Sequence, residues 1–311
     1  MLARRVAVGA LTCWDFERSR AGSGASALFW GMTVTVHAPE IESRPIWSHS
    51  CVLDDLVAAY AIDPAVVEKL DTESGWARRW TARWKTAQAE VICPVQELAS
   101  VPAIASVPVR GFTWRAGQRH RPGLQYLLAT GRMHGFESLA ERNLLLALDF
   151  AGEVVEVLSQ PFKMRFTTAD GSEDHTPDFL VLLPDTALLI DVRPGHLVKD
   201  KDLVKFAATE WAAGAVGWRY LVASGWRRQV LTGLDALSAR RRPMSDRLGL
   251  QGELLGLVRE RPRRFGELAE ETSLPAVARA HAVHLLWYRH LAMDLTQPLD
   301  DSTWIYPVGR A

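Results

Sequence analysis

The clearest pattern of hydrophobic and polar positions begins near Phe136. Residues 138–150 place Leu144, Leu145 and Leu148 on one face at helical spacing, which predicts an amphipathic helix. Short apolar runs then predict strands at 154–158, 163–168, 178–183, 187–192 and 218–223, with a helix at 200–213 before the last strand. This order predicts an α/β core in which a mixed sheet is flanked by helices. Its last strand–helix–strand unit is expected to be a right-handed crossover that joins parallel strands.

The pattern changes in kind after about residue 243. Residues 247–260, 265–272 and 276–291 have helical periodicity, and two short strands are expected around 294–296 and 304–306. Three helices followed by a hairpin form the outline of a winged helix-turn-helix. Such an outline is found in DNA-reading domains and also in modules that dock proteins, and the sequence leaves both roles open.

The region before the core is predicted to be helical over residues 50–92. Its apolar residues recur at steps of three and four, most visibly in Trp76, Trp80 and Trp84. We interpret this tryptophan stripe as the buried face of a helix rather than as a platform that stacks nucleic-acid bases. Residues 94–108 contain several prolines and are expected to form a linker.

The first 31 residues show no period. They are expected to be a disordered or non-native N-terminal extension, and one interpretation starts translation at Met32. The chain is therefore divided into an extension (1–31), a helical N-terminal region of unknown role (32–109), the α/β core (110–242) and the winged-helix-like domain (243–311).

Composition limits the classes of function. The chain has 311 residues with 36 Lys+Arg against 36 Asp+Glu, which excludes a histone-like coat of positive charge. Arginines gather locally, so DNA binding through a patch stays open; they include Arg110, Arg115, Arg119, Arg121 and Arg240–Arg242. The three cysteines, Cys13, Cys51 and Cys93, are too far apart for a CxxC pair, which favours a reducing cytoplasm. Because no run approaches 18 apolar residues, no membrane partner is expected.

Four charged residues stand out because they fall on buried-type elements. Glu141 shares the inward face of the 138–150 helix, where a carboxylate is costly unless a cation or hydrogen-bond donors compensate it. Asp178 follows Pro177 at the start of an apolar strand, and alternation places Asp191 and Arg193 on one face of the next strand. This arrangement resembles the PD-(D/E)xK nucleases, in which carboxylates hold a hard divalent ion that activates a water molecule beside the scissile phosphate.

A wider resemblance covers about residues 110–242. Six segments occur in order with plausible gaps: GLQYLLATGRMHGFES (123–138), LAER (139–142), LDF (148–150), SQPF (159–162), HTPDF (175–179) and DVRP (191–194). Together they resemble TnsA-type transposase endonucleases, and most of all the actinobacterial branch of that family.

The resemblance implies a restriction-endonuclease-like fold and a set of site residues. Glu141 matches the family's helix glutamate and Asp178 its metal-binding aspartate. Asp191 stands where the family carries Gln or Glu. The implied cofactor is Mg²⁺, with Mn²⁺ as a substitute, bound by these three carboxylates and by the backbone carbonyl of Val192. Gln160 and His175 are candidate accessory residues, although a structural turn amide explains Gln160 equally well and a lone histidine is more often structural.

Arg193 departs from the family, which usually carries Lys at that position. Arginine can orient or stabilise a phosphate but cannot serve as a general base, because it stays charged. Either the metal alone activates water and Arg193 neutralises the transition state, or this copy is impaired.

The resemblance also implies partners: double-stranded DNA at transposon ends, a DDE-type transposase subunit and an AAA+ ATPase regulator. Two alternatives remain open, namely a catalytically impaired module that binds DNA or partner proteins, and a stand-alone defence or repair nuclease of the same fold.

Overall fold

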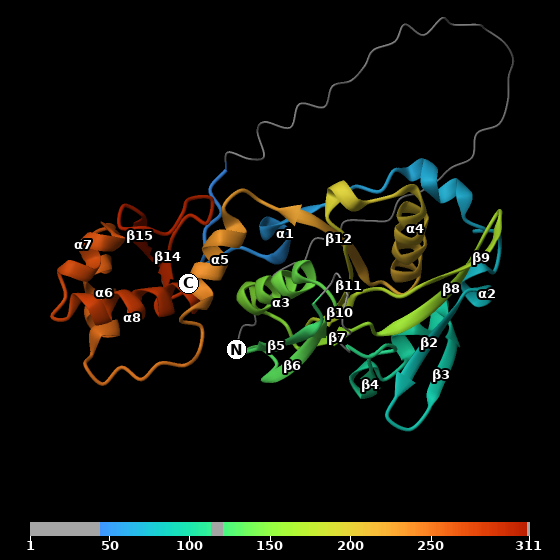
Figure 1. Cartoon of the computed structure of the whole chain (residues 1–311), viewed down its shortest axis with the longest axis horizontal. Coiled ribbons are helices and arrows are strands. Elements are labelled where there is room, and N and C mark those ends of the chain that lie inside the picture. The colour runs from blue at the N-terminus through green and yellow to red at the C-terminus, as the bar shows by residue number, and fades with distance from the viewer. Residues whose placement is uncertain (1–43, 113–120, 310–311) are drawn as a thin grey trace, which may run out of the picture. The chain divides into compact units, whose positions relative to one another are not determined.

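The computed structural model describes residues 44–112 and 121–309, which all belong to one compact unit. The expected extension 1–31, Cys13, Arg115 and Arg119 lie outside the described residues. The described chain is an α/β fold in which mixed and antiparallel sheets are flanked by helices (Figure 1). None of its helices is long and apolar enough to cross a membrane.

The central sheet has five strands in the order β1-β12-β11-β10-β7. Their bounds are Val57–Ala59 (β1), Glu156–Ser159 (β7), Phe179–Leu182 (β10), Ala187–Val192 (β11) and Arg219–Trp226 (β12). β11 and β12 are parallel and are connected through α4 (Asp200–Ala215), whereas the other neighbours are antiparallel. The predicted pair of parallel strands joined by a helix is therefore confirmed.

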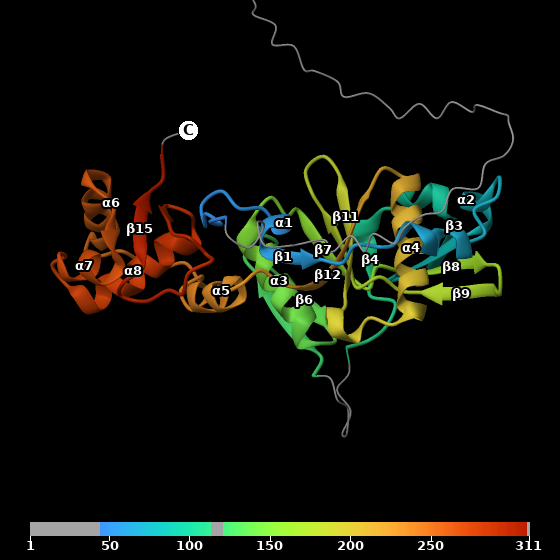
Figure 2. The same cartoon turned by 90° about the horizontal axis from the view of Figure 1, so that it is seen from above.

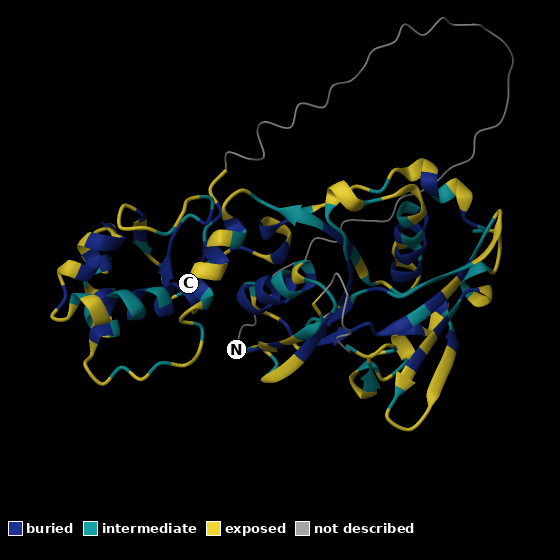
Figure 3. Ribbon diagram, in the orientation of Figure 1, coloured by how far each residue is buried: buried dark blue, intermediate teal, exposed yellow. Residues whose placement is uncertain are grey.

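The two faces of this sheet are covered by different helices. In β11, Leu188 and Ile190 belong to a hydrophobic cluster that includes the buried leucines of α3 (Leu139–Ala151). Ala187 and Leu189 belong to a second cluster that includes the alanines of α4. Because successive strand residues point to opposite faces, α3 and α4 lie on opposite sides of the sheet (Figures 2 and 3).

The N-terminal region is not the predicted helical region. Its described residues, 44–109, contain only four-residue α-helices, 3₁₀ turns and strands: α1 (Leu53–Leu56), α2 (Trp76–Arg79), η1 (Pro64–Lys69), η2 (Val95–Ser100), η3 (Ala103–Ala105), β1, β2 (Thr81–Thr86), β3 (Glu90–Pro94) and β4 (Ser106–Val107). Trp80 and Trp84 are indeed fully buried, but Trp84 lies on β2 and Trp80 directly precedes it. A spacing of four residues keeps side chains on one face of a strand as well as of a helix, so the stripe was misassigned.

The expected linker at 94–108 is also wrong. Val95 and Leu98 of η2 are fully buried in the cluster that contains Trp80 and Trp84. β2 pairs with β3, with β4 and with β8 (Phe162–Thr168), and β8 continues into a hairpin with β9 (Gly171–His175). The segment before residue 110 therefore packs as part of the core.

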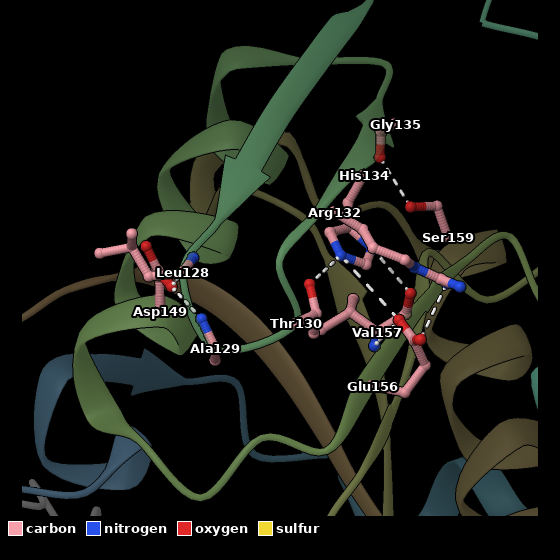
Figure 4. Close-up of polar contacts among 10 residues, drawn as sticks. All are labelled: Leu128, Ala129, Thr130, Arg132, His134, Gly135, Asp149, Glu156, Val157 and Ser159. Atoms are coloured by element: carbon pink, nitrogen blue, oxygen red, sulfur yellow. Dashed lines mark hydrogen bonds and ion pairs between the residues drawn. The ribbon is translucent and has the colours of Figure 1, made fainter. Parts of the chain in front are cut away.

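A hairpin that the pattern did not reveal, β5 (Gly123–Leu127) with β6 (Arg132–Phe136), covers the edge of β7 through side chains (Figure 4). His134 Nδ1 lies 2.8 Å from the carbonyl oxygen of Val157, and Ser159 Oγ donates to the carbonyl oxygen of Gly135 at 2.8 Å. The amide of Val157 donates to Glu156 Oε1 at 2.9 Å. Side chains therefore satisfy backbone groups of an edge strand that has no ladder partner on this side.

The C-terminal part contains the helices α5 (Val230–Ser238), α6 (Leu250–Glu260), α7 (Phe265–Glu270) and α8 (Pro275–Trp287) and a small sheet ordered β13-β15-β14 (Arg263–Arg264, Trp304–Pro307, Leu291–Ala292). The last three helices confirm the pattern-based prediction. The first predicted strand is displaced, because Asp294 instead accepts hydrogen bonds from the amides of Ile46 and Thr296.

Candidate active site

Asp178 and Asp191 face each other on adjacent strands. In the antiparallel pair β10–β11, Phe179 lies opposite Ile190, so Asp178, one residue before β10, lies opposite Asp191. The amide of Asp178 donates to the carbonyl oxygen of Ile190 at 3.1 Å and continues the ladder to this point. Directly opposite residues share a face of the sheet, and here it is the face covered by α4. The two aspartates of the predicted site are therefore brought together.

Asp191 is buried, at 3% exposure, and its charge is compensated by hydrogen bonds. His175 Nε2 lies 3.0 Å from both carboxylate oxygens, and the hydroxyl of Tyr220 donates to Oδ2 at 2.6 Å. Burial and the neighbouring Asp191 hold the pKa of Tyr220 well above its usual range, so the phenol remains a donor. His175 is thus a contact of the site, as one interpretation of the sequence proposed.

The surroundings of Asp178, in contrast, disfavour the charged form of its carboxyl group. Its Oδ2 accepts one hydrogen bond, from the amide of Val192 at 2.8 Å. Burial raises the pKa of Asp178 well above its usual value, and the charges of Asp191 and Glu141 raise it further. This repulsion indicates that the three predicted carboxylates act on one another across a common space.

Glu141 lies in the first turn of α3 and completes a reciprocal cap with Ser138. The amide of Glu141 donates to Ser138 Oγ at 3.2 Å, and Ser138 Oγ donates to Glu141 Oε1 at 2.8 Å. The amide of Glu137 donates to Oε2 at 2.7 Å. Burial raises the pKa of Glu141 although these hydrogen bonds lower it. These hydrogen bonds at the start of α3 alone explain why a glutamate stands here, so binding a metal ion would be a second role.

Arg193 lines the same pocket as the aspartates, and its guanidinium contacts α4 and the loop before that helix. Its Nη2 lies 3.3 Å from Asp202 Oδ2, and its Nε donates to the carbonyl oxygen of Leu197 at 3.1 Å. Asp202 also accepts from the amide of Lys199 at 3.1 Å and caps the helix. The guanidinium is therefore engaged with the N-terminal turn of α4.

Gln160 supports the site through its backbone. It adopts a left-handed conformation with φ of 48°, and its amide donates to the carbonyl oxygen of Asp178 at 2.7 Å. The side chain is 2% exposed, and neither of its polar atoms has a hydrogen-bond partner among the residues the structure describes. It does not line the pocket that contains the aspartates, so the structural interpretation of Gln160 is the simpler one.

A pocket of about 960 Å³ contains Glu141, Asp178 and Asp191 together with His175 and Val192. Cationic side chains share its walls: Arg83, Arg110, Arg121, Lys163, Arg193 and Lys205. Further carboxylates line it as well: Glu137, Asp174 and Asp202. The cationic side chains suit an anionic ligand, and the carboxylates suit a cation that binds beside that ligand.

The donor chemistry of the pocket fits a hard divalent ion, because carboxylate oxygens that repel one another are stabilised by a cation between them. The present side-chain positions do not form a closed metal cluster. Within residues 44–112 and 121–309, no three His, Cys, Asp or Glu side chains are grouped closely enough to hold a metal ion. The expectation that all three carboxylates already surround a cation-sized gap is therefore wrong for these positions, since Glu141 is engaged with Ser138 and Asp191 with His175 and Tyr220.

Comparison with models of known protein families gives no match, and comparison with curated proteins gives none either. The assignment of a function therefore rests on the geometry of this site and on the resemblance of the sequence segments described above.

Sequence reasoning missed Tyr220 and Lys205. Tyr220 could have been found from the pairing of the two predicted parallel strands. Leu189 of β11 lies opposite Tyr220 of β12, so both share the face of the sheet that carries Asp191. Lys205 stood on a predicted helix, but the register of that helix against the sheet was not readable from spacing alone.

Proposed function

We propose that the chain is a Mg²⁺-dependent DNA endonuclease of the restriction-endonuclease-like fold, acting as a TnsA-like subunit that cuts one strand at transposon ends. The observation that supports this most directly is the pair of facing aspartates, Asp178 and Asp191, with Glu141 in their electrostatic field. Two acidic groups in a half-buried pocket cost stability, and their common use in nucleases is to hold a divalent ion.

The order of elements around the pair agrees with such a nuclease. α3 covers one face of the sheet, β7, β10 and β11 are antiparallel neighbours, and α4 leads into the parallel strand β12. The three helices α6, α7 and α8 with the sheet β13-β15-β14 support the proposal of a winged helix-turn-helix domain. That domain would dock DNA or a partner protein.

A bound Mg²⁺ or Mn²⁺ ion would supply an activated water molecule and positive charge beside the scissile phosphate. Asp178 and Asp191 would hold it, with Glu141 and the backbone carbonyl of Val192 as further ligands. His175 and Tyr220 would keep Asp191 in place through the bonds described above. The cationic side chains of the pocket would contact phosphates of the DNA backbone.

The remaining parts of the proposal follow from the resemblance. A TnsA-like subunit would work in the cytoplasm beside a DDE-type transposase that cuts the other strand, under an AAA+ ATPase regulator. The local arginine clusters, including Arg240–Arg242, provide positive charge for double-stranded DNA on a chain of zero net charge.

The test is cleavage of a supercoiled plasmid that carries transposon ends, with Mg²⁺, with Mn²⁺ and with a chelator. Asp178→Ala should lower the rate by at least about 10²-fold, as loss of one preorganised group of an active site typically does. Asp185→Ala is the matched control, because Asp185 lies exposed in the turn between β10 and β11. Undiminished metal-dependent cutting by Asp178→Ala would exclude this site.

A second candidate, a binding module without cleavage, is favoured by one observation. Arg193 is engaged with α4, and the three carboxylates do not form a closed cluster as they stand. A wild-type protein that binds duplex DNA tightly but shows no nicking with either metal would support this module and exclude the nuclease.

A further inference from the structure

The cationic residue expected at the site, Arg193, already has a structural function. Its guanidinium joins the end of β11 to the carbonyl oxygen of Leu197 and to the capping residue Asp202 of α4. Moving it onto a substrate phosphate would break both contacts and free the first turn of the helix. The fold therefore uses Arg193 to position α4 against the sheet.

Other cations of the pocket are also paired. Lys163 Nζ lies 2.7 Å from Asp174, Arg110 lies 3.4 Å from Glu137, and Arg83 lies 3.6 Å from Glu90. Each pair is at least partly exposed and holds its cation near the rim of the pocket.

Lys205 differs from these cations. Lys205 is a half-buried residue that lines the pocket, and in the part of the chain that the structure describes no carboxylate lies within ion-pair distance of its ammonium group. Among the described residues Arg121 is a second lining cation without such a pair, but it is exposed. A cation that lines a pocket without a carboxylate partner is suited to meeting an anion that arrives with a ligand.

The position of Lys205 follows from the helix register. It lies three residues after Asp202, on the same side of α4, while Ala207 and Ala208 pack into the cluster that contains Leu189. Asp191 is two residues after Leu189 on that face of the sheet. Lys205 and the aspartate pair therefore enter one pocket from the two layers that enclose it.

We propose that Lys205, and not Arg193, is the catalytic cation of this site, and that its ammonium group contacts a non-bridging oxygen of the scissile phosphate. This inference rests on the proposed function. Lysine is a compact charge on a flexible stem and can follow the phosphate as negative charge develops during cleavage, whereas the guanidinium of Arg193 stays with α4.

The experiment compares Lys205→Ala, Lys205→Arg and Arg193→Ala with Lys201→Ala, a control one turn earlier on α4 whose side chain is exposed and does not line the pocket. Single-turnover nicking in Mg²⁺ should fall about 10²–10³-fold in Lys205→Ala and recover most of that loss in Lys205→Arg. Arg193→Ala should lose less activity than Lys205→Ala, but its melting temperature should be lower than that of Lys205→Ala. Lys201→Ala should behave as the wild type.

A second readout separates this inference from the proposed function. Fluorescence anisotropy with a duplex in Ca²⁺ measures binding, and the slope of log K against log salt concentration should decrease in magnitude by about 0.9 in Lys205→Ala, which is the effect of one lost phosphate contact. Lys201→Ala should keep the wild-type slope. A wild type that never cuts, together with a changed slope in Lys205→Ala, would exclude the nuclease and retain the phosphate contact. Unchanged slope and unchanged rate in Lys205→Ala would overturn the inference.

Discussion

His134 fastens the β5–β6 hairpin to the edge strand β7, and we expect its replacement to destabilise the protein. The imidazole is 4% exposed and lies between the carbonyl oxygen of Val157, 2.8 Å from Nδ1, and the hydroxyl of Thr130, 2.6 Å from Nε2 (Figure 4). Since a carbonyl oxygen can only accept, Nδ1 carries the proton, and Nε2 accepts from Thr130.

The magnitude follows from these two bonds. His134→Leu leaves the Val157 carbonyl, in a residue that is 2% exposed, without a donor, at a cost of about 1–3 kcal/mol. Loss of the bond to the half-buried Thr130 adds about 0.5–1.5 kcal/mol, so the free energy of unfolding should fall by about 1.5–4.5 kcal/mol. His134→Asn is the matched control. Its side-chain amide nitrogen lies near the position of Nδ1 and can still donate to Val157, so it should recover at least half of the loss.

Lowering the pH should also reduce the contribution of His134 to stability. Burial lowers the pKa of His134 below its ordinary value, and this outweighs the nearby Glu156, which raises it. The folded state therefore binds this proton less readily than the unfolded chain does. The contribution to stability is complete above about pH 6.5 and is lost as the pH falls toward the folded pKa. Asparagine does not titrate, so the stability difference between wild type and His134→Asn should shrink between pH 7.5 and pH 5.5.

Urea unfolding at both pH values, followed by tryptophan fluorescence and by circular dichroism, measures these differences. A His134→Leu variant within about 0.5 kcal/mol of wild type, the usual scale for surface changes, would refute the reasoning. Equal stabilities of the Leu and Asn variants would show that the donor to Val157 does not matter.

Three further outcomes are expected. Asp178→Asn should abolish cutting and raise the melting temperature of the metal-free protein. The raised pKa of Asp178 lowers the stability of the wild type only as the pH rises above about 4. The gain in melting temperature should therefore be absent at pH 3.5 and present at pH 7. Tyr220→Phe removes the donor to the buried Asp191, and chemical denaturation should show a loss of about 1–3 kcal/mol. Arg263 is 4% exposed and donates to Glu271 and to the carbonyl oxygen of Leu257, whereas its glutamate partners are largely exposed. Arg263→Ala should therefore lower the free energy of unfolding by about 1–3 kcal/mol, and a neutral result in the same denaturation experiment would contradict a role for Arg263 in stability.

Local chemistry made much of the core predictable. The helical spacing of Leu144, Leu145 and Leu148 predicted α3, and the apolar run of β11 was predicted to its observed bounds. Asp178 and Asp191 were predicted to lie on adjacent strands, because strand alternation and short connections leave few ways to arrange them.

The remaining features depended on contacts between distant segments. Whether Trp80 and Trp84 belong to a helix or a strand was decided by pairing of β2 with β8, about 80 residues later in the chain. The hairpin β5–β6 contains Met133 and Leu124, both exposed, so it lacks the clean alternation that marks a strand. The partners of Arg193 and the placement of Lys205 follow from how α4 packs, which no local pattern encodes.

The segment that follows Arg44 has a consequence for how the protein is made. The amide of Ile46 donates to Asp294, 248 residues later, and β1 completes the edge of the central sheet beside β12. At ribosomal rates of about 5–20 residues per second, this segment waits about 10–50 s for its partner. Until then the core cluster that contains Ile46, Met293 and Leu295 is incomplete, so Ile46 remains in water. Nascent chains stalled before residue 290 should therefore bind chaperones. Ribosomes that pause late in the message should increase the aggregation of this protein.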